Sequence, residues 1–151
     1  MPAWTKTKKR KAISTAKFYF FDVGVMHQLA EIYTIEPNSD RYGQAFEHFI
    51  AMELNAYLSY SRKNFSLNFW AAQNGQEVDF IIGDDIAIEI KATKSVSTKH
   101  LKSLKALQEE QICKKYFLVS FDKIHRIHEG IEIIYWENFL DLLWQHKILV
   151  D

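Results

Sequence analysis

The stretch "EVDFIIGDDIAIEIKAT", residues 77–93, decides the fold of this chain. Apolar and polar residues alternate on both sides of Gly83-Asp84-Asp85, which is the two-residue period of β-strands joined by a turn. A three-residue loop there pairs Ile82 with Ile86, whereas a two-residue loop would shift the register by one position. With the longer loop, the apolar residues share one face: Val78, Phe80, Ile82, Ile86, Ile88 and Ile90. The stretch therefore predicts an antiparallel hairpin with one apolar face.

Three ionisable residues occupy the other face of this hairpin. Counting outward from the turn places Asp79 opposite Glu89, and Lys91 follows Glu89 by two residues on the same side. Two carboxylates at that separation stay ionised only beside a positive charge, which a hard divalent cation such as Mg²⁺ supplies. Lys91 could then orient a water and stabilise charge on a phosphoryl oxygen. The alternative is a solvent-facing hairpin whose charges serve solubility alone.

Hydrophobic spacing predicts the helices of the chain. The expected helices are residues 23–33 after the N-cap Asp22, residues 41–61, a helix from Ser95 or Ser97 to Glu110, and the closing segment "ENFLDLLWQH". The helix over residues 41–61 is the most regular, because its apolar residues recur at steps of three and four. Lys99, Lys102 and Lys105 form a basic ridge on the third helix, which either follows a nucleic-acid backbone or is a solvated face.

The same analysis predicts strands around the hairpin. They are residues 18–21, residues 65–71 with one buried face, residues 114–121 covered on both faces, and the segment "IEIIYW". From residue 41 the order is helix, three strands, helix and strand, followed by an appended strand and helix. This order indicates an α/β domain.

The composition is typical of a globular chain. Missing motifs argue against a nucleotidase, a dinucleotide-dependent enzyme, a zinc ribbon and an α/β-hydrolase. The 151 residues are 48% hydrophobic and 25% charged with zero net charge, and no apolar run approaches the roughly 20 residues that a membrane span needs. Cys113 is the single cysteine, so no internal disulfide can form. The sequence lacks the glycine-rich phosphate and dinucleotide loops, paired C-x-x-C motifs and the G-x-S-x-G elbow. A soluble, cytoplasmic protein without membrane contact is expected.

The charge is unevenly distributed along the chain. Residues 1–17 carry only basic ionisable side chains: Lys6, Lys8, Lys9, Arg10, Lys11 and Lys17. We interpret residues 1–16 as a basic leader or linker, and residues 17–151 as a single domain. The leader either contacts phosphates or is a solvated connection to an upstream segment.

Three motifs in a fixed order resemble a known superfamily. Glu47 lies in "YGQAFEHFIAMEL", Asp79 in "EVDF", and Glu89 and Lys91 in "IEIKAT". Together they resemble the PD-(D/E)XK, or restriction-endonuclease-like, superfamily, with Val-Asp in place of Pro-Asp at Asp79. The segments "KFYFFDVGVMHQLA", "GQAFEHFIAMEL" and "NGQEVDFII" more narrowly resemble the C-terminal domain of a group of bacterial and archaeal AAA-type ATPases, over about residues 14–120.

The resemblance implies an α/β fold with an αβββαβ core, in which a central mixed sheet is flanked by helices, plus the extra C-terminal strand and helix. It implies Asp79 and Glu89 as ligands of Mg²⁺ or Mn²⁺, and Glu47 as a holder of the metal or its water. Lys91 would position the attacking water for hydrolysis of a nucleic-acid phosphodiester, with DNA as the expected partner.

A second, non-catalytic interpretation also follows from the resemblance. The domain would then bind nucleic acid, or dock a protein as the C-terminal module of an AAA-type ATPase. An ATPase half normally precedes this domain, so the chain is expected to be a fragment or a stand-alone form. An apolar surface exposed by the loss of that neighbour would favour a homo-oligomer.

Overall fold

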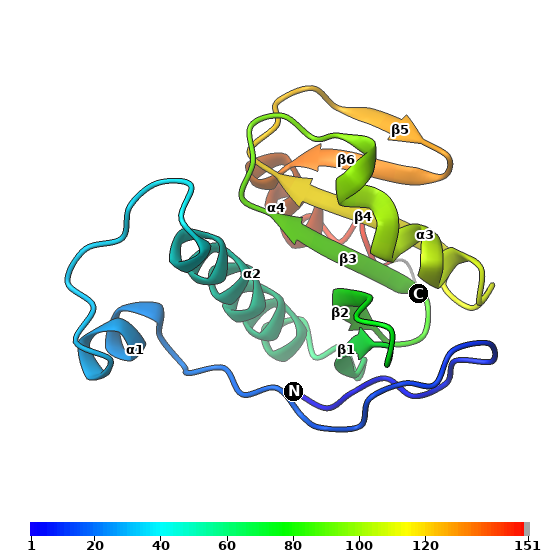
Figure 1. The fold of residues 1–151 in the computed structure, drawn as a ribbon, viewed down its shortest axis with the longest axis horizontal. Helices are drawn as coiled ribbons and strands as arrows, with labels where there is room; N and C mark the ends of the chain where they lie inside the picture. The colour runs from blue at the N-terminus through cyan, green and yellow to red at the C-terminus, as the bar shows by residue number, and fades with distance from the viewer. Residues whose placement is uncertain (150–151) are drawn as a thin grey trace.

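The computed structural model describes residues 1–149. The chain folds into one mixed sheet with helices on both faces (Figure 1). The helices are α1 (Val23–Leu29), α2 (Asp40–Tyr60), the short 3₁₀ helix η1 (Thr98–Leu101), α3 (Lys102–Gln108) and α4 (Trp136–Trp144). The strands are β1 (Leu67–Ala71), β2 (Glu77–Ile82), β3 (Ile86–Lys91), β4 (Lys115–Ser120), β5 (Arg126–His128) and β6 (Ile131–Tyr135), in the spatial order β1-β2-β3-β4-β6-β5. The predicted α/β fold class is confirmed.

The hairpin forms with the predicted register. Ile82 pairs with Ile86 and Phe80 pairs with Ile88 across the antiparallel β2–β3 ladder. Gly83 adopts a φ of 60°, a left-handed conformation that glycine reaches without a Cβ clash, and its N–H donates to the carbonyl of Ser66 at 2.8 Å. The three-residue loop is therefore the one observed.

Parallel strands continue the sheet beyond the hairpin. β3 pairs in parallel with β4, the segment of η1 and α3 connects them, and β4 pairs in parallel with β6. The sequence did not predict β5, a three-residue edge strand paired antiparallel to β6. Its central side chain, Ile127, is 69% exposed, so no buried alternation marks the strand in the sequence.

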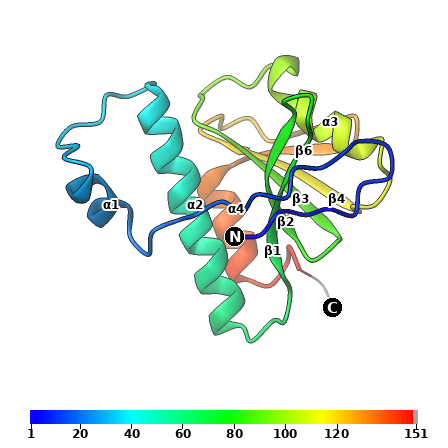
Figure 2. The ribbon, with the colours of Figure 1, turned by 60° about the horizontal axis from the view of Figure 1, so that its bottom comes forward.

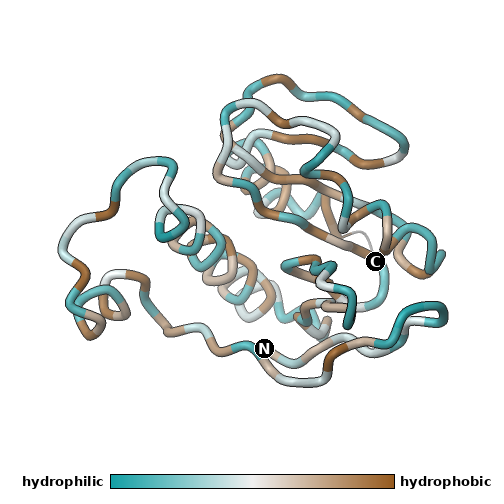
Figure 3. The backbone as a smooth tube through the Cα atoms, viewed as in Figure 1, coloured by the Kyte–Doolittle hydropathy of each residue, from teal (hydrophilic) through white to brown (hydrophobic). Residues whose placement is uncertain are grey.

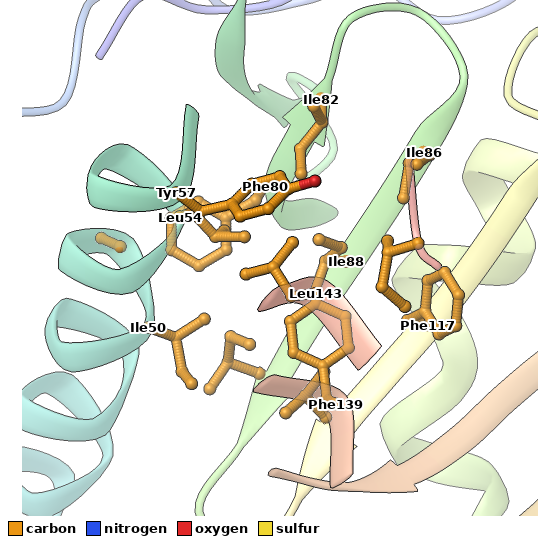
Figure 4. Close-up of a cluster of buried hydrophobic side chains, with 14 of the residues drawn as sticks. Ile50, Leu54, Tyr57, Phe80, Ile82, Ile86, Ile88, Phe117, Phe139 and Leu143 are labelled. Atoms are coloured by element: carbon orange, nitrogen blue, oxygen red, sulfur yellow. The ribbon is translucent and has the colours of Figure 1, made fainter. Parts of the chain in front are cut away.

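Two apolar cores lie on opposite faces of the sheet. Helices α2 and α4 cover one face, where Ile50 and Leu54 of α2 meet Phe139 and Leu143 of α4 over the apolar side chains of the hairpin (Figures 2 and 4). Helix α3 covers the other face with Leu104, Ala106 and Leu107. Burial of one such large side chain stabilises the fold by about 2 kcal/mol. None of the described helices has the length and apolar character to cross a bilayer.

The basic leader packs along β1. Ala3 and Ala12 form backbone bridges to Phe69 and Ala72, so the leader runs out and back beside the sheet edge (Figure 1). Trp4 is buried, and its indole N–H donates to Asp84 at 2.9 Å. Figure 3 shows the difference in hydropathy between the hydrophilic turn of the leader and the apolar strands β3 and β4. The division at residues 16 and 17 stays a prediction.

Three sequence-based expectations about local structure are wrong. Residues 18–21 form no strand, because no neighbouring strand pairs with them, and Phe18 and Phe21 are exposed. Helix α1 ends at Leu29 rather than near residue 33. β1 is buried on both faces, because Trp4 from the leader packs in the same apolar cluster as the fully buried Trp70.

Candidate active site

The site is built around a β-bulge in β2. The β1–β2 register shifts around Phe69, between two pairs: Asn68 with Ile81, and Trp70 with Val78. Phe69 alone separates these pairs on β1, whereas both Asp79 and Phe80 separate them on β2. The extra residue of the bulge therefore belongs to β2, where Asp79 and Phe80 together lie opposite Phe69. Bulges re-aim a side chain and occur often beside active sites.

The bulge corrects one expectation about the hairpin. Val78 was expected to share a face with Phe80 and Ile82, which pack in the core under α2. Val78 instead packs with Ile81 in the core under α3. The reason is that one extra residue reverses the alternation of a strand beyond the bulge.

The two predicted carboxylates meet where the β2–β3 backbone ladder ends. Phe80–Ile88 is the last backbone pair of that ladder, and Asp79 and Glu89 occupy the next positions. The Asp79 carboxylate accepts the backbone N–H of Ile90 through Oδ2 at 2.8 Å. This hydrogen bond holds the Asp79 side chain against β3 beside Glu89.

Both carboxylates are buried, and their proton affinity is strongly altered. Burial raises the pKa of Asp79 well above its usual range, and the neighbouring Glu89 and Glu47 carboxylates add to the increase. Burial likewise raises the pKa of Glu89, to about 7, although Lys91 opposes the shift. These shifts indicate a pair that cannot hold two negative charges without a nearby cation.

Lys91 lies directly beside this pair, as the sequence predicted. Its Nζ is 2.6 Å from Glu89 Oε1. Burial alone would lower the pKa of Lys91, but the Glu89 and Asp79 carboxylates outweigh burial and raise it. The ammonium therefore stays charged within the site.

The donor atoms fit a hard divalent cation in part. Within residues 1–149, Glu89 Oε2 is buried without a hydrogen-bond partner, and it lies in a site whose other donors are carboxylate oxygens. Such an oxygen suits Mg²⁺ or Mn²⁺, which prefer oxygen ligands. However, the described residues contain no group of three or more His, Cys, Asp or Glu side chains arranged to hold a metal. Asp79 and Glu89 could thus offer two ligands, and the described residues place no third His, Cys, Asp or Glu side chain with them.

Glu47 approaches the site from α2 but is held by the segment before α1. Its Oε1 accepts a hydrogen bond from the Tyr19 hydroxyl at 2.5 Å and lies 3.5 Å from Lys17 Nζ. Lys17 also forms an ion pair with Glu77 at the start of β2. Glu47 still contributes to the raised pKa of Asp79, which places the two carboxylates in one electrostatic environment.

Sequence reasoning did not identify Lys17, Tyr19 or Glu77 as site residues. Glu77 was expected on the same face as Asp79, but the bulge reverses the alternation before Asp79, so this counting could not place Glu77 at the site. Lys17 and Tyr19 lie about thirty residues before Glu47, and no spacing rule connects a coil segment to a helix at that distance. Only the packing of the segment before α1 against α2 and β2 brings them to the carboxylates.

The lysine ridge divides into free and paired members. Lys99 on η1 and Lys102 on α3 are exposed, whereas Lys105 forms an ion pair with Glu129 at 2.6 Å. Burial lowers the pKa of His100, and the positive charges of Lys91 and Lys99 act in the same direction. This shared influence places η1 near the site at the end of β3.

Comparison with known proteins identifies the family of the chain. No curated protein and no solved structure matches it. Residues 42–139, more than half of the chain, match the domain of unknown function DUF4143, and this range includes Glu47, Asp79, Glu89 and Lys91. The chain therefore belongs to the DUF4143 family, which is known as a C-terminal domain of AAA-type ATPases.

Proposed function

We propose that this domain is a nuclease that uses Mg²⁺ or Mn²⁺ to hydrolyse phosphodiester bonds of nucleic acid, with DNA as the substrate. One observation carries the proposal: the buried carboxylates of Asp79 and Glu89 lie together, with Lys91 beside them and Glu89 Oε2 unpaired. The order of these residues on a hairpin, after Glu47 on a long helix, supports it through the resemblance to the PD-(D/E)XK superfamily.

Each residue of the site has a distinct role in this proposal. Asp79 and Glu89 would hold the cation, and the Ile90 N–H keeps the Asp79 carboxylate oriented toward it. A bound divalent cation neutralises the carboxylate pair and lowers the pKa of a bound water. Lys91 orients the attacking water and stabilises negative charge on a phosphoryl oxygen. Glu47 holds the cation or its water once its side chain is free of Lys17 and Tyr19.

Replacement of Lys91 by methionine tests the catalytic role. Lys91→Met removes the ammonium while keeping a long side chain, so we expect DNA cleavage to slow by about 100-fold or more. Cleavage of linear, nicked, branched and single-stranded DNA would be measured with Mg²⁺ and with Mn²⁺, and circular dichroism would check the fold. Lys147→Met is the control, because Lys147 is exposed and pairs only locally with Gln145.

Two results would contradict the nuclease proposal. One is the lack of cleavage of every substrate with either metal. The other is an equal cleavage rate for the wild type and Lys91→Met. Calorimetric titration with Mn²⁺ adds an independent check, because Asp79→Asn and Glu89→Gln should each weaken Mn²⁺ binding by at least about tenfold.

A non-catalytic docking module is the second candidate function. The segment around α1 projects away from the sheet (Figure 1) and exposes several large apolar side chains: Phe18, Phe21, Val25, Leu29 and Tyr33. Exposed apolar groups of this kind suit a protein partner, such as an AAA-type ATPase domain or a second copy of the chain. A docking module predicts that Lys91→Met leaves every binding affinity unchanged and that no cleavage occurs.

A further inference from the structure

We infer that Lys17 holds Glu47 at the edge of the candidate metal site as an internal cation, and that a divalent ion must displace Lys17 before Glu47 can join Asp79 and Glu89. The inference rests on the proposed metal site and adds a competition between that ion and a residue of the chain itself. The segment of residues 13–20 would act as an intrasteric latch.

The contacts of Lys17 are those of a cation among carboxylates. Its ammonium forms an ion pair with Glu77 and lies 3.5 Å from Glu47 Oε1. The same Nζ lies 5.1 Å from the centroid of the Phe69 ring, directly opposite the bulge. Lys17 therefore balances charge at the edge of the site where the third carboxylate is held.

Tyr19 strengthens this arrangement from the same segment. Its hydroxyl donates to Glu47 Oε1 at 2.5 Å, so one carboxylate oxygen interacts with both Tyr19 and Lys17. Both contacts engage the same oxygen of Glu47, Oε1, so this oxygen already has partners within the chain. This explains why the described residues include two buried carboxylates at the site but no arrangement of three.

The latch segment has no regular secondary structure and has space beside it, while Tyr19 packs against the core under α2. Residues 13–20 lie outside any helix or strand. Their described backbone hydrogen bonds join Ile13 to Ala71, Lys17 to Met1 of the leader, and Phe20 to the His48 ring. A cavity of about 1010 Å³ borders Phe18 and Tyr19, and a second of about 360 Å³ borders Lys17 and Glu47. Side chains of the segment can thus move without breaking the sheet.

Electrostatics make the exchange favourable for a divalent ion. Glu47, Glu77, Asp79 and Glu89 form one acidic cluster, and within residues 1–149 the ammonium groups of Lys17 and Lys91 pair with it. A doubly charged ion interacts with the same carboxylates about twice as strongly as an ammonium at equal distance. Displacement of Lys17 is therefore driven by the gain in charge at the site.

Calorimetric titration of the whole chain with Mn²⁺ tests the competition. A site that must first release Lys17 has an apparent affinity reduced by the fraction of molecules with the latch open. We expect Lys17→Met to bind Mn²⁺ about tenfold more tightly than the wild type. Lys11→Met is the matched control, because Lys11 is an exposed lysine of the same leader, and its affinity should stay within about twofold.

The outcomes separate this inference from the proposed function. Unchanged or weaker Mn²⁺ binding by Lys17→Met would overturn the latch while leaving the metal site intact. If neither protein binds Mn²⁺, both the latch and the proposed nuclease are wrong. Tighter binding that disappears in the double variant Lys17→Met/Glu89→Gln supports both.

Limited proteolysis of the unmodified chain gives a second readout that does not depend on a substitution. Trypsin cleaves after Lys17 only when the segment leaves the site, so Mn²⁺ should raise the initial cleavage rate of the Lys17–Phe18 bond several-fold relative to the Lys11–Ala12 bond. Glu89→Gln should abolish that increase. A rate that Mn²⁺ leaves unchanged or lowers in the wild type would contradict the latch.

Discussion

Asp79 and Glu89 are two buried carboxylates with one ammonium, Lys91, beside them. Two such acids cannot both ionise cheaply in a buried site, so the protein holds either a proton or a cation there. Their burial is disadvantageous for stability when both are charged. A pair of this kind is typical of functional sites, where buried charges serve to bind a ligand rather than to stabilise the fold.

The raised pKa of Glu89 predicts how stability depends on pH. Because the pKa of about 7 in the folded state exceeds the usual value near 4.3, the folded protein binds more protons than the unfolded chain between these values. The free energy of unfolding without metal should therefore be greatest below pH 4.5 for this group, and should decrease by on the order of 3 kcal/mol as pH rises through 7. Asp79 acts in the same direction.

Urea denaturation in EDTA from pH 4.5 to 8 measures this dependence. Glu89→Gln cannot ionise, so its free energy of unfolding should vary less with pH than that of the wild type. The difference between the two proteins is the quantity to compare, because Glu110 and Asp122 have lowered pKa values and change stability at lower pH. Parallel curves for the two proteins would disprove the assignment.

At the scale of elements, the leader is joined to the domain through Glu110, just beyond α3. The Glu110 carboxylate is buried and accepts the backbone N–H groups of Lys8 and Lys9 at 2.6 and 2.8 Å, and it also contacts the Arg10 guanidinium at 3.4 Å. These contacts lower the pKa of Glu110, although burial opposes them. One side chain thus caps the turn of the leader.

Removal of this carboxylate should detach the leader. Glu110→Ala leaves two backbone donors and the Arg10 charge without their acceptor, so we expect the free energy of unfolding to fall by about 2–4 kcal/mol. Glu109→Ala is the control, since that exposed carboxylate pairs only with Arg10 and should cost less than about 1 kcal/mol. Urea denaturation compares them, and equal losses would argue against the capping role.

The hairpin also shows, at the scale of elements, which features local sequence patterns predict and which they do not. Its loop and register followed from alternation and from Gly83, both of which are local. The bulge at Asp79 did not, because it is a relation between β2 and β1 that appears only when Phe69 faces two residues. Ser97, rather than Ser95, precedes η1, with its N–H donating to His100 Nδ1 at 3.0 Å.

At the scale of the whole molecule, the net charge is zero, but some basic side chains are paired with acids and others are exposed. Arg10 and Lys6 pair with acids of the domain, whereas Lys99 and Lys102, on η1 and α3, remain exposed. Acidic side chains of the domain thus neutralise part of the positive charge of the leader. The free lysines are the better candidates for contacts with a phosphate backbone.

The salt dependence of DNA binding tests this division. Each phosphate contact contributes about 0.9 to the slope of log affinity against log salt, so Lys99→Gln/Lys102→Gln should reduce the slope by about 1.8. Lys105→Gln should change it much less, because Lys105 pairs with Glu129. The slopes of both variants would be measured by fluorescence anisotropy with duplex DNA, over a salt range of about 50 to 200 mM. Equal effects of the two changes would contradict the assignment.

The sequence by itself determined the order helix, three strands, helix and strand from residue 41, the hairpin register and the proximity of Asp79, Glu89 and Lys91. All of these depend on local periodicity and on one turn, which neighbouring residues encode directly. The tertiary structure alone decided the bulge, the double burial of Trp70, and the contacts of Lys17 and Tyr19 with Glu47. These features arise where segments distant in the chain meet, and packing between such segments leaves no period in the sequence.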